Sequence, residues 1–158
     1  MTCRFAWKSC SRVSPPDRLR HGAPRFGNES AEGNRHRLAA TLLAELGRRV
    51  VVPWPVFVEV DLLLRSRGFP NAALAFGTAL HNRVHRLVAL SDAELQTTLM
   101  LGRRYSDTGV DLPGLTVMAM ASTRDAPILT WDFRHFRTVV LHPDHYWELL
   151  VTEDQLPE

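Results

Sequence analysis

From Arg37 onward, the apolar positions of this chain fall into two alternating patterns. Short continuous apolar runs predict buried strands at 50–52, 87–90, 126–129 and 138–141. Between them, apolar residues recur every three or four positions and predict helices over 37–46, 55–67, 71–83, 92–105 and from about 112, with a last helical turn over 145–150. Strands that alternate with helices indicate an α/β domain with a parallel sheet.

The first 35 residues lack this periodicity, and Pro15, Pro16 and Pro24 interrupt any regular element. Basic residues outnumber acidic ones there. We therefore expect an irregular basic segment over 1–35, a folded domain over 36–150 and a C-terminal tail over 151–158. The basic segment is either disordered without a role or an arm that touches nucleic acid.

The composition is that of a soluble globular protein, with 45% hydrophobic and 23% charged residues in a chain of 158. This length fits one domain. The chain contains neither an apolar run long enough to cross a bilayer nor the apolar stretch of a secretory signal. Two cysteines, Cys3 and Cys10, are too few for a disulfide framework, so we expect a cytoplasmic protein with no membrane association.

Arginine supplies nearly all of the positive charge, because Lys8 is the only lysine in a chain of net charge +2. A guanidinium group binds phosphate through two parallel hydrogen bonds, which makes RNA or DNA a reasonable partner. A high-GC genome would produce the same bias without any such role. Both interpretations remain open.

Acidic side chains follow two of the predicted strands at comparable points. Glu59 lies in the early turns of the helix after the strand at 50–52. Asp132 lies three residues after Leu129, directly after the segment Ile128-Leu129-Thr130-Trp131. Asp107 and Asp111 lie in the loop that leads to the helix before Ile128. Carboxylates at such positions suit Mg²⁺ or Mn²⁺ and support phosphodiester hydrolysis. The alternative is that each acid only caps a turn or a helix.

Three segments carry a resemblance to a known family: Val51-Val52-Pro53 leading to Val58–Leu63, Tyr105-Ser106-Asp107, and Leu129–Phe136. Around them, from about His36 to His142, the chain resembles PIN-domain proteins of the VapC toxin type. The resemblance covers about two thirds of the chain. It implies a PIN-like three-layer α/β/α fold with a parallel sheet, together with a Mg²⁺-dependent endoribonuclease activity that hydrolyses RNA.

The same resemblance implies the parts of the site and its partners. Glu59 and Asp132 would be catalytic and metal-binding acids. Asp111, also taken as catalytic, or Asp107 would stand in for the family's third acid as a further metal ligand. Arg134 and Arg137 border these acids in sequence and are candidates for holding RNA phosphates, although a solvated basic surface explains them equally well. The implied cofactor is Mg²⁺, with Mn²⁺ as a substitute. The implied partners are RNA, a small antitoxin of the VapB type, and a second copy of the chain in a homodimer.

The chain also departs from the family pattern. The family opens with an apolar central strand that ends in aspartate, and no match to that strand is present. Asp17 lies at about the right distance, but Pro15 and Pro16 precede it, and proline is excluded from a central strand. The family's third acid aligns with Gly114. We therefore expect the first strand to be missing or replaced.

Two explanations fit these departures. In the first, residues 1–35 come from a wrong start or another reading frame and stand in place of the family's opening. In the second, the chain is a catalytically degenerate PIN-domain remnant that binds an antitoxin or RNA without cleaving it.

Overall fold

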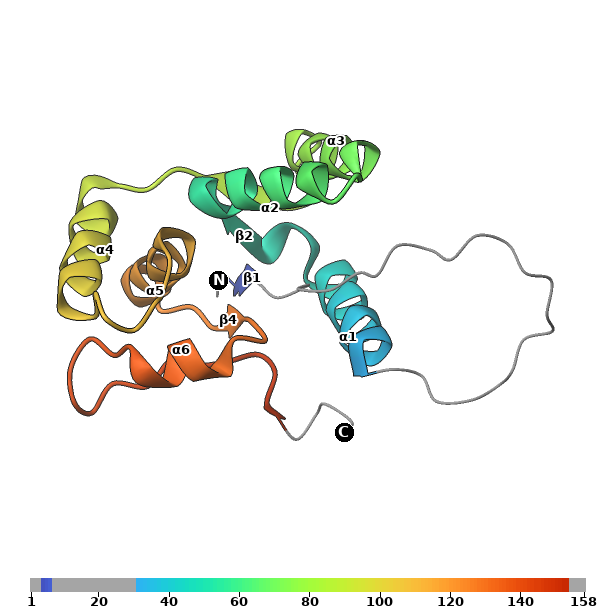
Figure 1. The fold of residues 1–158 in the computed structure, drawn as a ribbon. Coiled ribbons are helices and arrows are strands. Elements are labelled where there is room, and N and C mark those ends of the chain that lie inside the picture. Colours follow the sequence, from blue (N-terminus) through green and yellow to red (C-terminus); the bar gives the residue numbers. More distant parts are fainter. Residues whose placement is uncertain (1–3, 7–30, 154–158) are drawn as a thin grey trace.

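The computed structural model describes residues 4–6 and 31–153, and all statements about the structure refer to these residues. The elements, in chain order, are β1 (Arg4–Ala6), α1 (Ala31–Leu46), the 3-10 helix η1 (Gly47–Arg49), β2 (Val50–Pro53), α2 (Trp54–Ser66), α3 (Pro70–His81), β3 (Arg86–Val88), α4 (Asp92–Arg104), α5 (Leu112–Arg124), β4 (Ile128–Leu129) and α6 (Phe133–Thr138). From α2 onward, two helices stand between one strand and the next, which confirms the predicted α/β class (Figure 1).

The four strands form one parallel sheet in the order β3-β2-β1-β4. The central strand β1 pairs Phe5 with Val51 of β2 on one side and with Ile128 of β4 on the other. The first strand is therefore replaced and not missing. Three residues are too short to show any periodicity, so the sequence pattern alone places residues 4–6 in the irregular segment. Their place follows from the main-chain groups of β2 and β4, which need hydrogen-bond partners in the middle of the sheet.

Leu129 and its neighbour Ile128 show that helices cover both faces of the sheet. Consecutive strand residues point to opposite faces. Ile128 belongs to a large apolar cluster with Met118 and Met120 of α5, whereas Leu129 belongs to a second cluster that includes Leu42 of α1. Figure 1 shows α1 on one side of the strands and α4 and α5 on the other. The result is the expected three-layer α/β/α arrangement.

Two predicted elements after α6 are wrong. Residues 138–141 form no strand, because both main-chain polar groups of Val140 bind the hydroxyl of Tyr105: the hydroxyl donates to Val140 O at 2.9 Å and accepts from Val140 N at 3.3 Å. Residues 145–150 form no helical turn. Instead, this segment runs parallel to β4, with Ile128 N donating to Glu148 O and Leu150 N donating to Ile128 O, both at 2.8 Å.

Helix boundaries otherwise lie close to the predicted ones, except that α1 begins at Ala31, well before the predicted start at Arg37. Asp17 and most of the segment 1–35, which is predicted to be irregular, lie outside the described residues. In the part of the chain that the structure describes, no helix has the length and apolar character required to cross a membrane.

Removing the Tyr105 hydroxyl tests how the segment after α6 is held. We expect Tyr105→Phe to lower the free energy of unfolding by about 1–2 kcal/mol, because Val140 N and O lose their partner in a partly buried place. Urea denaturation followed by circular dichroism measures this loss. The matched control is Tyr146→Phe, whose side chain is 86% exposed and should change stability by less than about 0.5 kcal/mol. Equal losses in the two variants would contradict the assigned contact.

Candidate functional site

The carboxyl edge of the sheet brings together the two chain segments that carry the best candidate acids. All strand pairs are parallel, so β2 and β4 end at the same edge, and β1 lies between them. The chain leaves β2 directly into α2, whose second turn contains the half-buried Glu59. It leaves β4 through Thr130 and Trp131 to reach Asp132 at the start of α6. Ligands of open parallel sheets bind at this edge.

Asp132 is held in place by three contacts. It is the N-cap of α6, and its carboxylate accepts a hydrogen bond from His135 N at 3.4 Å. The other carboxylate oxygen lies 2.6 Å from Nδ1 of the His135 imidazole. The Asp132 N–H donates to Thr130 Oγ1 at 3.0 Å. Since Phe133 and Phe136 anchor α6 in the apolar interior, the carboxylate is presented in a defined orientation and partly buried.

Asp111 and Asp107 occupy the loop between α4 and α5. Asp111 is the N-cap of α5 and accepts a hydrogen bond from Gly114 N at 2.9 Å. Gly114, which aligns with the family's third acid, is buried in the first turn of that helix. Asp107 is exposed in the turn that follows Tyr105. The capping role that sequence analysis left open is therefore observed for Asp111 and for Asp132.

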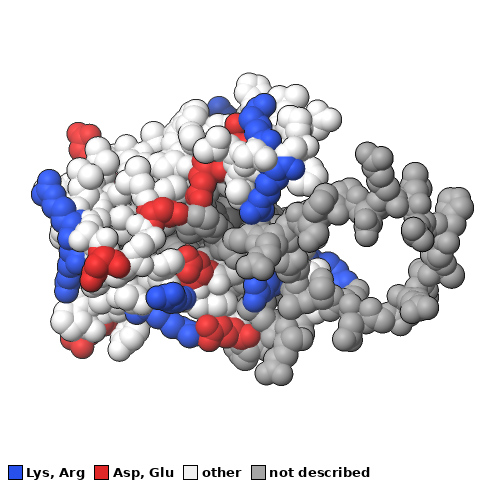
Figure 2. All heavy atoms as spheres, viewed as in Figure 1, with Lys and Arg blue, Asp and Glu red and all other residues white. Residues whose placement is uncertain are grey.

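The candidate acids do not form a closed metal-binding group among the described residues. Among residues 4–6 and 31–153, no three His, Cys, Asp or Glu side chains lie together as a metal-binding group. On the face shown in Figure 2, acidic side chains lie singly or in small groups and form no single acidic patch. Mg²⁺ usually takes one or two carboxylates and completes its shell with water and substrate phosphate. Glu59 and Asp132 supply the correct donor chemistry for that mode, and a closed cage is not formed.

The two arginines predicted to bind RNA differ in their surroundings. Arg134 is exposed on α6, two residues after Asp132. Arg137 forms an ion pair of 2.8 Å with Glu153, and its guanidinium lies 5.7 Å from the centre of the Phe133 ring. Arg134 is thus the better placed of the two to approach a phosphate near Asp132.

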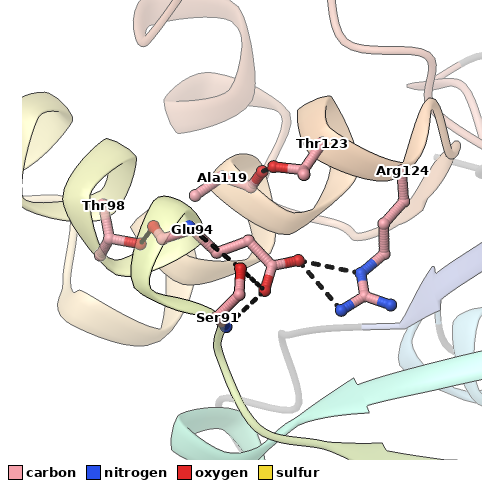
Figure 3. A network of polar contacts seen from close by, with 6 residues as sticks. All are labelled: Ser91, Glu94, Thr98, Ala119, Thr123 and Arg124. Atoms are coloured by element: carbon pink, nitrogen blue, oxygen red, sulfur yellow. Dashed lines mark hydrogen bonds and ion pairs between the residues drawn. The ribbon is translucent and has the colours of Figure 1, made fainter.

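Glu94 is the most deeply buried acid in the described chain, and sequence analysis did not single it out. It is 1% exposed. Figure 3 shows its carboxylate between Ser91, the N-cap of α4, and Arg124 in the last turn of α5. Ser91 N and Oγ donate to one oxygen at 2.7 and 2.8 Å, and Arg124 Nε and Nη2 each lie 3.0 Å from the other. The available signal was Ser91-Asp-Ala-Glu94, a capping-box pattern.

The environment of Glu94 keeps its carboxylate ionised. Burial alone would raise the pKa of Glu94, but the hydrogen bonds from Ser91 and the positive charge of Arg124 outweigh burial, so the pKa lies below its ordinary value. Ser91 and Arg124 belong to the cap of α4 and to α5, away from Glu59 and Asp132 in the sequence. Glu94 therefore joins the start of α4 to the end of α5 and has a structural role.

No protein-family model and no curated protein matches this chain. One solved structure similar to it is a chain of a "Toxin-antitoxin complex from Klebsiella pneumoniae". The two chains are 15% identical, and the match covers 63% of this chain and 77% of that one with a TM-score of 0.48. A likeness at this level assigns neither a fold nor an activity to the chain.

Replacing Glu94 by glutamine tests the buried ion pair. We expect Glu94→Gln to lower the free energy of unfolding at neutral pH by about 3 kcal/mol, because Arg124 would be left without its counter-charge. Denaturant titration measures the loss. The control is Asp92→Asn, an exposed acid in the same first turn of α4, which should cost less than about 0.5 kcal/mol.

The loss of stability caused by Glu94→Gln should depend on pH. The folded-state pKa of Glu94 is lowered, so its contribution is present above the unfolded-state pKa and is lost as the pH falls through the folded-state pKa. The difference in stability between wild type and Glu94→Gln should therefore narrow when the titration is repeated at about pH 3. A difference that stays constant or widens there would contradict the assignment.

Two substitutions at Asp132 separate its capping role from its charge. Alanine removes the cap and should lower the free energy of unfolding by about 1–2 kcal/mol, whereas asparagine caps helices nearly as well and should cost less than about 0.5 kcal/mol. Thermal melts of both variants make the comparison. Equal destabilisation by Asp132→Asn and Asp132→Ala would show that the charge, and not the cap, stabilises α6.

Proposed function

We propose that this chain is a Mg²⁺-dependent endoribonuclease of the PIN-domain type and the toxin of a toxin–antitoxin pair. One observation carries the proposal. The strand order places the segments that leave β2 and β4 on either side of the central strand at one edge, and each segment brings a carboxylate. Those carboxylates belong to Glu59 and Asp132, which lie within the segments that resemble the family.

Glu59 and Asp132 are the residues that would hold the ion, with Asp111 or Asp107 assisting from the loop before α5. A bound Mg²⁺ would supply an activated water and offset negative charge on the phosphate that is attacked. The contact from His135 to Asp132 at 2.6 Å fixes the orientation of the carboxylate, as hydrogen bonds behind a metal ligand usually do. Arg134 is placed to hold a neighbouring phosphate of the RNA.

An exposed apolar stripe on α2 supports the proposed protein partner. Trp54, Val58 and Leu62 recur at a spacing of four residues along one line of the helix, and all three are exposed. Apolar side chains gathered in this way mark interaction surfaces. Glu59 follows Val58 on the same helix, so a small antitoxin bound to this stripe would lie beside the proposed site. A homodimer is proposed from the family resemblance alone.

A second candidate is the catalytically degenerate remnant, which would bind an antitoxin or RNA without cleavage. Three observations favour it. Gly114 occupies the place of the family's third acid, and no group of three potential metal ligands is assembled among the described residues. The central strand β1 also ends at Ala6, which is followed in sequence by Trp7 and Lys8 where the family has aspartate.

Substitution of the two acids distinguishes these candidates. For an active enzyme, Glu59→Gln and Asp132→Asn should each reduce Mg²⁺-dependent cleavage of a single-stranded RNA by at least about 100-fold, because each removes a negative oxygen ligand. Gel electrophoresis of labelled RNA measures cleavage, and calorimetric titration measures Mg²⁺ binding. Asp92→Asn, an exposed acid on α4, is the control and should leave both unchanged.

Unchanged cleavage and Mg²⁺ binding in both acid variants would show that the site is placed wrongly. A folded wild-type protein without a saturable Mg²⁺ site and without cleavage would identify the remnant.

A further inference from the structure

A basic groove runs along β3, the outer strand of the sheet, and its arginines stand at the amino ends of β2 and β3, opposite the edge that carries Glu59 and Asp132. Its basic side chains are three arginines and two histidines: Arg48 of η1, His81 at the end of α3, Arg83 and His85 in the following turn, and Arg86 at the start of β3. Arg48 stands just before β2, and parallel strands begin at a common edge. The groove is therefore separate from the proposed cleavage site.

The chemistry of this groove is cationic at its surface and apolar beneath. Arg48, Arg83 and Arg86 are exposed, whereas Leu80 is buried and Leu87 is half-buried. None of the residues lining the groove carries a carboxylate. His85 is fixed through its Nδ1, which lies 3.0 Å from Gly47 O. Guanidinium groups around a shallow basic groove match the geometry of phosphate oxygens.

Arg49 provides an internal comparison. Its guanidinium donates to the main-chain oxygens of Leu46 and Glu45 at 3.4 and 3.1 Å, which places it over the end of α1. Arg48, the residue immediately before it in the chain, lines the groove instead. The two adjacent arginines thus have different positions, and only the first lines the basic surface.

Arg83 occupies a backbone position that is costly for arginine. Val84 N donates to Ala79 O and Arg83 N donates to Leu80 O, both at 3.0 Å, which is the hydrogen-bond pattern of a Schellman motif at the end of α3. Arg83 has the left-handed φ of 59° that this motif requires and that glycine adopts most easily. A strained residue at a surface groove points to a role for its side chain.

We propose that this groove binds the phosphate backbone of an RNA strand. The ligand class follows from the proposed function, but the binding needs no metal and no cleavage. An acidic peptide is the other polyanion to consider. The groove favours RNA because its exposed surface is almost entirely cationic, while its apolar residues are buried or half-buried and offer little to an amphipathic peptide. RNA bound there would lie along β3, beside η1 and the end of α3.

The test measures binding in the absence of divalent metal, so that cleavage plays no part. Full-length protein is titrated into a short fluorescein-labelled single-stranded RNA in EDTA at several salt concentrations, and anisotropy is recorded. Arg48→Gln should weaken binding by at least about threefold and reduce the slope of log affinity against log salt by about 0.7, the value for one phosphate contact on a single strand. Arg103→Gln on α4 removes the same charge from another surface and is the control.

Arg83→Gly provides a second test, because it keeps the helix end intact. This variant relieves the left-handed strain, so its melting temperature should not fall, while its affinity for RNA should fall like that of Arg48→Gln. Wild-type affinity and salt slope in both groove variants would overturn the proposal. So would groove variants that lose binding of a labelled polyglutamate peptide but keep RNA binding. If cleavage assays with Mg²⁺ fail but metal-free RNA binding depends on the groove, only the proposed catalysis is wrong.

Discussion

The pairing of one three-residue strand on both of its sides is the constraint on which this structure depends. Arg4–Ala6 contributes little length, yet it is the hydrogen-bonded link between β2 and β4. On one side it connects to β2, β3 and the helices α2 and α3. On the other it connects to β4, to the C-terminal segment that continues the sheet at Leu149, and to the second apolar cluster beneath α1. Without this strand, the main-chain groups along two strands would be left unpaired in the interior.

Polar groups inside the helical layer are satisfied by a few specific side chains. Tyr105 binds both main-chain groups of Val140, and Glu94 joins Ser91 to Arg124 across the two helices that follow β3. Both side chains connect segments that are not joined by the regular hydrogen bonds of a helix or a strand. Helix α5, whose residues 114–121 are all buried, is enclosed in this way without relying on apolar contacts alone.

The parallel topology places the two candidate acids and the arginines of the groove at opposite ends of the strands. Glu59 and Asp132 are carried by the segments that leave β2 and β4, whereas Arg48, Arg83 and Arg86 lie where the chain enters β2 and β3. Because all strands run in one direction, these two groups lie at opposite edges of the same sheet. A long polyanion could contact the arginine edge while a metal-dependent step takes place at the other. The proposed cleavage and the proposed groove therefore assign different tasks to the two edges.

The sequence by itself determined the local elements. Apolar spacing located α2, α3, α4 and α5 to within a few residues, and Val50–Val52 was recognisable as a strand because apolar runs of that length are buried. It also identified Glu59 and Asp132 as acids that follow strands. The sequence could not show that Asp132 is held by His135, since a contact of that kind depends on the conformation of the turn.

Only the tertiary structure decided which short segments complete the sheet. Residues 4–6 and 148–150 have too little length for a periodic signal, and both became extended because neighbouring strands offered unpaired main-chain groups. Residues 138–141, which have the apolar character of a strand, did not form one, and the Tyr105 hydroxyl satisfies both main-chain groups of Val140. The basic groove likewise arises from residues far apart in the chain, from Arg48 to Arg86, that the parallel pairing of β2 and β3 brings side by side.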